Sequence, residues 1–224
     1  MRGTLTLAAL AAVVFLCSVV QVAWADPAAV KLRAGDIFSD ERAAVAADGP
    51  VGSVAIVAAR NGSFSGRVLV SSAETIKGLR GSVSTLKTDD GTALADRCTQ
   101  VRYAVAFDDS WRRYRPGGLD VILESAPESV SPRDKGPALA AVWLTVTPAK
   151  DAKAGLYKGE MTVEAAGLPA TKVPVEVTVT DWTVPAAHDW RTWVGMIQSP
   201  DSLSMEYEVP MWSEEHWKLI ARSF

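Results

Sequence analysis

Alternating apolar and polar residues dominate the second half of the chain. Three runs show this pattern, at residues 142–147, 157–165 and 173–179, where apolar or small side chains occupy every second position. A period of two is typical of β-strands that have one buried face and one face toward solvent. Polar segments containing proline and glycine separate the runs at residues 148–155 and 167–169. The pattern therefore predicts an antiparallel β unit with a single core face.

Further strands are predicted upstream, at residues 52–59, 64–71, 81–86, 101–107 and 119–124. Asn61 and Gly62 can adopt the positive φ angles of a tight hairpin turn between the first two of these strands. No helical period is convincing between residues 49 and 181, and short strands at even spacing favour a sandwich. We therefore predict an all-β fold, an immunoglobulin-like antiparallel β-sandwich over residues 49–185, after a lead-in segment at residues 26–48.

The pattern changes after residue 185. Residues 191–197 predict a short buried strand, and Ser213 is a good N-cap for a helix that carries an apolar stripe. The stripe consists of Trp217, Ile220, Ala221 and Phe224. A strand and an amphipathic helix cannot bury their apolar faces alone, and this helix reaches the last residue without a capping glycine. We therefore expect residues 186–224 to begin a second domain of alternating β/α type, inside which the chain is truncated.

The N-terminus has the features of a signal peptide. Arg2 is followed by an almost uninterrupted apolar run over residues 5–20, and residues 23–25 (Ala-Trp-Ala) fit a small-x-small cleavage site. A retained membrane anchor is the alternative, and a lipoprotein anchored through Cys17 is disfavoured by the bulky residue before it. We predict that residues 1–25 are removed and that the protein is exported, in bacterial fashion, to the periplasm, the cell surface or the medium.

Charge and cysteine content narrow the range of partners. Arg2 is the only charged residue in the predicted signal peptide, so its removal changes the net charge from −3 to −4. A mildly acidic chain is a poor partner for nucleic acid or for an anionic membrane surface, and we expect neither. Cys98 alone would remain after cleavage, which leaves no internal disulfide. A mature chain of about 200 residues can bury an adequate core without one.

Three motifs follow one another along the chain. The first is Ala-Ala-Arg-Asn-Gly-Ser-Phe at residues 58–64, between the first two predicted strands. The second is the strand at residues 142–148 with the turn that follows it, up to residue 159. The third is the closing strand and its Asp-Trp-Thr-Val-Pro exit, at residues 173–185. In this order the motifs resemble the N-terminal β-sandwich of glycoside hydrolase family 123 and of related secreted bacterial proteins, and the similarity covers residues 52–185 and the entry into the barrel that follows this sandwich in the family.

The resemblance implies a parent enzyme that removes β-linked N-acetylgalactosamine from glycans or glycolipids. In that family a (β/α)₈ barrel follows the sandwich, and the acetamido oxygen of the substrate attacks the anomeric carbon, which departs from the usual scheme of two catalytic carboxylates. Residues 186–224 would then be the first strand and helix of a truncated barrel. Catalytic groups of a barrel lie on loops after its strands. The resemblance therefore places no catalytic, cofactor-binding or metal-binding residue on this chain, whose glycan or glycoconjugate substrate would bind the missing barrel.

Two sets of aromatic residues are local candidates for function. Aromatic faces stack on sugar rings, so a glycan contact is possible in a basic aromatic segment, at Trp111, Arg113 and Tyr114. Packing of this segment on the sandwich, with solvated arginines, is the interpretation we favour. The second set clusters at the domain junction and consists of Trp182, Trp190 and Trp193. We predict that these tryptophans pack in the interface between the two domains.

Other polar candidates are better explained by structure. Glu214 and Glu215 suit the first turn of a helix, and consecutive helical residues do not converge on one atom. His188 and His216 have no cysteine or histidine neighbours at zinc spacing, and Cys98 is expected to be a small buried side chain.

The alternative function is a stand-alone exported immunoglobulin-like module for adhesion or carbohydrate binding. A relative whose barrel has lost its carboxylates is a third possibility.

Overall fold

The computed structural model describes residues 30–47, 49–106, 118–133, 136–192, 195 and 199–223. The chain divides into two compact units, unit 1 at Met1–Thr183 and unit 2 at Val184–Phe224. The predicted signal peptide lies outside the described residues. Within the described ranges, no helix is both long enough and apolar enough to cross a membrane.

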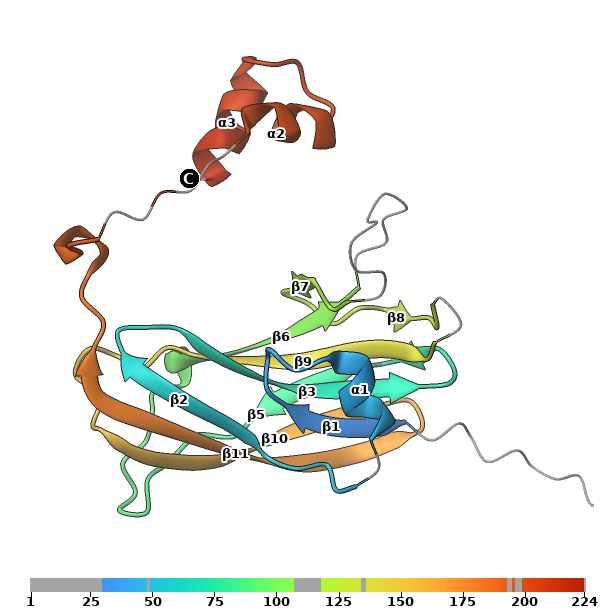
Figure 1. The fold of residues 1–224 in the computed structure, drawn as a ribbon, viewed down its shortest axis with the longest axis vertical. Helices are drawn as coiled ribbons and strands as arrows, with labels where there is room; N and C mark the ends of the chain where they lie inside the picture. The colour runs from blue at the N-terminus through green and yellow to red at the C-terminus, as the bar shows by residue number, and fades with distance from the viewer. Residues whose placement is uncertain are drawn as a thin grey trace, which may run out of the picture. The chain divides into compact units, whose positions relative to one another are not determined.

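Unit 1 is built mainly of β-strands (Figure 1). In chain order its elements are β1 (Lys31–Gly35), α1 (Glu41–Ala46), β2 (Val54–Arg60), β3 (Phe64–Ser72), β4 (Ile76–Lys77), β5 (Arg80–Val83), the 3₁₀ turn η1 (Asp96–Cys98), β6 (Thr99–Val105), β7 (Val121–Leu123), β8 (Ser129–Val130), β9 (Ala138–Val146), β10 (Gly155–Ala165) and β11 (Leu168–Thr183). The mostly β class predicted from the alternation is confirmed.

The strands form two main sheets that pack as two layers. One sheet has the order β1-β3-β9-β6-β7 and the other has the order β2-β11-β10-β5, while β4 and β8 form a small ladder. Neighbouring strands are antiparallel except β2 and β11, which run parallel, with Val177 opposite Ile56. The sheets are therefore antiparallel, as predicted, apart from this one pair of strands.

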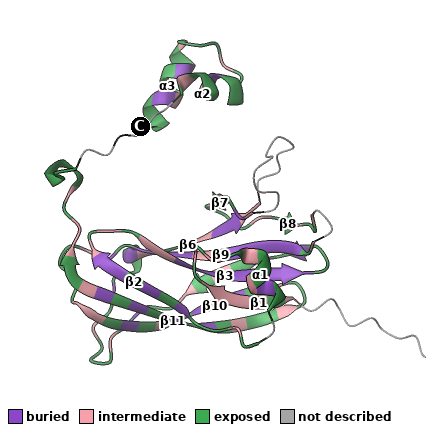
Figure 2. Cartoon of the chain, viewed as in Figure 1, coloured by how far each residue is buried: buried purple, intermediate pink, exposed green. Residues whose placement is uncertain are grey.

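The core lies between the two sheets and follows the predicted alternation. On β11, Val173, Val175 and Val177 are fully buried, whereas Glu176 between them is exposed. Figure 2 shows this alternation as buried and exposed bands along β11. Fully buried side chains that the two sheets contribute to this core include Val68, Val70, Leu144, Tyr157 and Met161. Apolar side chains from both layers thus remove one another from water, which is the main driving force for the fold.

The expected lead-in segment is part of the fold, which corrects the predicted start of the sandwich at residue 49. β1 pairs antiparallel with β3, and Leu32 packs against the core. α1 follows, capped by Asp40, whose carboxylate accepts a hydrogen bond from the Ala43 N–H at 2.7 Å. Both elements are too short for a period to stand out among the charged residues around them, so the sequence pattern did not reveal them.

The turn at Asn61 is also not the hairpin turn that was predicted. Asn61 has the expected positive φ, 60°, and its N–H donates to the Pro148 carbonyl at 2.8 Å. However, β2 and β3 lie in different sheets, so the turn carries the chain from one layer to the other. Alternation reports which face of a strand is buried but not which strand lies beside it.

Unit 2 contains η2 (Ala187–Asp189), α2 (Pro200–Glu206) and α3 (Glu214–Ser223). The predicted N-cap of α3 is confirmed, because Ser213 Oγ accepts a hydrogen bond from the His216 N–H at 3.2 Å. α2 was not predicted. A buried strand was predicted at residues 191–197. Residues 191, 192 and 195 are exposed and belong to no strand, and the other residues of this segment lie outside the described ranges.

The buried face of α3 differs from the predicted stripe. His216 and Ile220 are its buried residues, whereas the Trp217 side chain is 52% exposed. Polar His216 occupies the inner face because both of its ring nitrogens have hydrogen-bond partners.

Candidate functional site

The tryptophans predicted at the domain junction are only partly within the described chain. Trp182 lies near the end of β11 and is 61% exposed, and Trp190 is 47% exposed. The Trp190 indole Nε1–H donates to the Pro185 carbonyl at 2.9 Å. Trp193 lies outside the described residues. Trp182 belongs to unit 1 and Trp190 to unit 2, and their packing in an interface stays a prediction.

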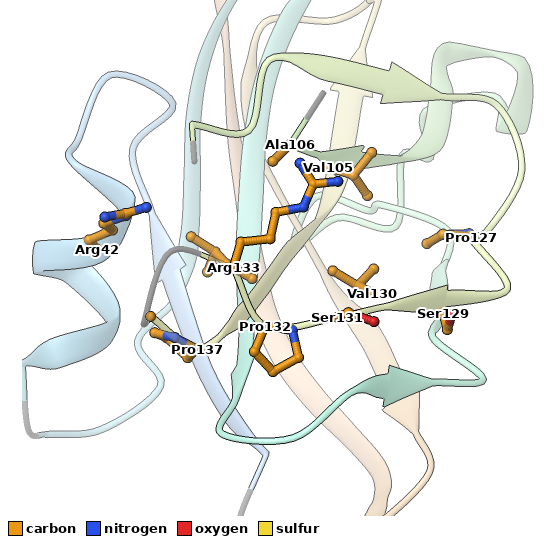
Figure 3. A pocket seen from close by; sticks show the side chains of 12 residues that line it. Arg42, Val105, Ala106, Pro127, Ser129, Val130, Ser131, Pro132, Arg133 and Pro137 are labelled. Atoms are coloured by element: carbon orange, nitrogen blue, oxygen red, sulfur yellow. The ribbon is translucent and has the colours of Figure 1, made fainter. Parts of the chain in front are cut away.

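The predicted glycan contact, formed by Trp111, Arg113 and Tyr114, lies outside the described residues as well. Within the described residues, a cavity of about 520 Å³ lies near the end of β6 and the start of β9 (Figure 3). Its apolar lining includes Val105, Pro127, Val130, Pro132, Pro137 and Leu139. Its polar lining includes Arg42, Ser129, Ser131 and Arg133.

Elements from distant parts of the sequence place these residues around one space. Arg42 projects from α1, which is held on the sheet by Val45, part of a small core cluster with Leu69 and Leu139. The opposite wall is β8, which is fixed by antiparallel pairing of Val130 with Ile76 of β4. Figure 3 shows Arg133 lying across the cavity toward the end of β6.

The cavity combines hydrogen-bond donors with an apolar lining. A volume of about 300–1,000 Å³ is typical of small-molecule sites. Guanidinium groups form planar donor pairs that suit carboxylates and other oxygen-rich ligands, and serine hydroxyls can both donate and accept. The arrangement therefore suits binding of a small, oxygen-rich molecule. The sequence pattern did not reveal this cavity, since Arg42 lies far from the other lining residues in the sequence and in a helix that was not predicted.

The remaining titratable candidates have ordinary surroundings. Across the described part of the chain, no group of three or more His, Cys, Asp or Glu residues could hold a metal ion. His188 is exposed, with Nε2 at 3.4 Å from the Asp189 carboxylate, and Cys98 is buried. Glu214 and Glu215 lie in the first turn of α3, where their charges complement the helix dipole.

A second polar cluster binds the loop before η1 to the turn between β9 and β10. Asp90 accepts hydrogen bonds from the Lys153 ammonium, from the Thr88 hydroxyl and from the Thr92 N–H. Beside it, Lys158 Nζ lies 3.1 Å from the Asp89 carboxylate. The hydrogen bond from Lys153, followed by those from the two threonines, holds the pKa of Asp90 well below its usual range. The hydrogen bonds and the ion pair of Asp90 therefore stabilise the folded state most while Asp90 is ionised.

Replacing Asp90 by asparagine should destabilise the fold in a pH-dependent manner. Because the pKa of Asp90 is lowered in the folded state, its contribution is complete above the pKa of the unfolded chain, about 4, and is lost as the pH falls further. In urea unfolding, the free energy of unfolding of Asp90→Asn should be lower than that of the wild type at pH 7, and this difference should become smaller at pH 3 and below. High salt should also reduce the difference, since the ion pair of Asp90 with Lys153 is exposed.

Asp89→Asn is the matched control for this experiment. Asp89 is 86% exposed and contacts only Lys158 among the described salt bridges, so its replacement should change stability little. A gap for Asp90→Asn that stays constant from pH 7 to pH 2.5 would contradict the role of the ionised carboxylate.

Comparison with known proteins shows a similarity in fold to a solved structure, but no match in sequence. No family model matches the sequence, and no curated protein matches it. The solved structure of a family 123 glycoside hydrolase from Clostridium perfringens, studied for glycolipid glycan hydrolysis, is similar with a TM-score of 0.61 and 14% identity. The match covers 86% of this chain and 34% of that one, so this chain spans about a third of the length of the hydrolase.

Two further solved structures show lower similarity. The ASH/PapD-like domain of human CEP192 has a TM-score of 0.35 at 9% identity, with 81% of this chain and 99% of that one covered. The N-terminal domain of PorA has a TM-score of 0.31 at 13% identity, with 68% of this chain and 98% of that one covered.

Proposed function

We propose that this chain is the N-terminal accessory β-sandwich, of immunoglobulin-like type, of an exported glycoside hydrolase similar to family 123. The main support is the extent of the structural likeness. Unit 1 ends at Thr183, whereas the match with the Clostridium perfringens hydrolase covers 86% of the 224 residues and so extends into unit 2. A likeness confined to a common sandwich would end with the sandwich. Unit 2 is accordingly proposed to be the beginning of a (β/α)₈ barrel.

In this proposal the chemistry belongs to the rest of the barrel. The parent enzyme would cleave β-linked N-acetylgalactosamine from glycans or glycolipids by substrate-assisted catalysis. By itself, the 224-residue chain is expected to have no glycosidase activity.

The test compares this chain with the product of the same reading frame extended downstream of the Phe224 codon. The extended protein should release the aryl group from an aryl N-acetyl-β-galactosaminide, and the 224-residue chain should not exceed a heat-denatured control. A stop codon directly after Phe224 in the genome, or hydrolysis by the short chain alone, would contradict the proposal.

A further inference from the structure

β2 ends one sheet of the sandwich, and its outer edge has no partner strand within the described chain. The strand order β2-β11-β10-β5 places β11 on one side of β2 and no strand on the other. In the described residues, the backbone of residues 54–60 makes no hydrogen bond outside its ladder with β11. The free edge of such a strand presents a row of unpaired N–H and C=O groups, to which a further strand can add.

The other strands that end the two main sheets carry the features that normally prevent edge pairing. β5 and β7 have only four and three residues. β1 has five residues, and two of them, Lys31 and Arg33, are charged. Short length and charged side chains are common protections of sheet edges. β2 is longer, with seven residues, and it contains no proline and no charge before Arg60. β2 is thus the least protected edge in the described part of the sandwich.

The outer face beside this edge is also apolar. Val57, at the centre of β2, is 68% exposed. Thr178 of β11 lies opposite Val57 on one side and opposite Leu156 of β10 on the other, and Leu156 is 40% exposed. A row of uncharged side chains therefore extends from the free edge across three strands of the sheet.

The sequence of β2 is complementary to itself in the antiparallel direction. With a twofold axis at Val57, residues equally distant from the axis pair with each other, and such residues point to the same face of the sheet. The central pairs then contain only alanine, isoleucine and valine, and the two Arg60 side chains lie at opposite ends of the pairing. The two exposed Val57 side chains become cross-strand neighbours, which is favourable for β-branched residues. Like charges do not oppose each other within β2.

We infer that the free edge of β2 pairs with the β2 edge of a second copy of this chain. The partner must supply a strand with a free edge and no charge over about the same length, and each copy supplies one. Pairing around a twofold axis uses the same surface on both copies and forms a closed dimer. The two four-stranded sheets would join into one sheet of eight strands. This inference goes beyond the proposed function and does not rest on it.

Analytical ultracentrifugation of the full chain at increasing concentration tests the inference. A single strand edge is a small interface, so we expect a reversible dimer with a dissociation constant of about 10–100 μM. Val57→Lys places two lysines opposite each other at the twofold axis and should weaken self-association about tenfold or more. Val57→Glu should do the same. An equimolar mixture of the two variants should restore association as a heterodimer, because opposite charges then meet at the axis.

Thr178→Lys is the matched control. It adds the same charge to the same face of the sheet, directly beside Val57, but on a strand that already has a partner on each side. Edge pairing should therefore persist in this variant, whereas stacking of two sheets face to face would be lost. Urea unfolding of each variant shows that it is folded. Because Val57 is mostly exposed, its replacement should leave the core intact.

Several results would overturn the inference. One is a chain that stays monomeric up to a concentration on the order of 1 mM, which would leave the edge to a strand of another protein or to none. Another is association that survives Val57→Lys, as contacts through residues 1–25 would, or that is lost equally in Thr178→Lys. A third is a dimer of the short chain that is absent from the product of the extended reading frame, because the edge would then be covered by the rest of the parent protein. Hydrolysis of the aryl glycoside is measured separately, so either idea can fail while the other stands.

Discussion

Replacing Arg67 by alanine is expected to lower the free energy of unfolding by about 3 kcal/mol. Arg67 lies on β3 and is 1% exposed. Its guanidinium donates to the Glu41 carboxylate at 2.7 Å, to the Ser39 carbonyl at 2.6 Å and to the Asp36 carbonyl at 3.2 Å. Truncation would leave these acceptors without their partner and would release the start of α1 from the sheet.

Urea unfolding of two further variants tests whether the loss of stability in Arg67→Ala comes from its buried hydrogen bonds. Arg67→Lys keeps the charge but cannot reproduce three directed bonds, so it should lose more than half as much stability as Arg67→Ala. Lys172→Ala is the control, since its ion pair with Glu160 at 2.7 Å joins two exposed side chains. It should cost less than about 1 kcal/mol. A loss below about 1 kcal/mol for Arg67→Ala would show that β3 does not need this anchor.

Arg67 also shows where sequence reasoning was insufficient. A period of two along the predicted strand at residues 64–71 implies one buried face, and Val68 and Val70 of β3 are buried in the core between the sheets. The same rule assigns Arg67 to the outer face, where a charged residue is normally solvated. It is buried because the segment before α1 covers that face, and α1 lies in the stretch that was taken for a lead-in. Burial of an outer-face residue depends on a distant covering element, which local periodicity does not report.

The same limit explains the outcome for the candidate sites. The N-cap at Ser213 and the positive φ of Asn61 are local properties, and both were predicted correctly. The cavity requires Arg42 and Arg133, which lie far apart in the sequence, to line one space, and the connection between α2 and α3 requires His216 to bond to the Trp212 backbone. Each of these contacts depends on a turn or a packing arrangement that has no periodic signal in the sequence.

Gly81→Ala is the second substitution with a large expected effect, a loss of about 2–3 kcal/mol. Gly81 lies on β5 of one sheet, and a Cβ atom there would lie 2.3 Å from Cγ1 of Val142 on β9 of the other sheet. The Gly81 N–H also donates to the Tyr103 hydroxyl at 3.1 Å, which fixes the strand at this separation. The obstacle is a stiff β-branched side chain in the core, so neither sheet can yield without losing contacts.

A double-mutant cycle with Val142→Ala tests this close approach between the sheets. Val142→Ala alone creates a cavity and should destabilise the protein, but it also makes room for the methyl group that Gly81→Ala introduces. The double variant should therefore be more stable than the sum of the single losses predicts, by at least about 1 kcal/mol in urea unfolding. Gly118→Ala, where a Cβ atom meets nothing within 4 Å among the described residues, should be nearly neutral. Additive losses would mean that Gly81 is required for its backbone rather than for its lack of a side chain. A non-additive result would mean that the spacing of the two layers is set by Gly81 and Val142, and that a larger residue at position 81 requires a smaller one on β9.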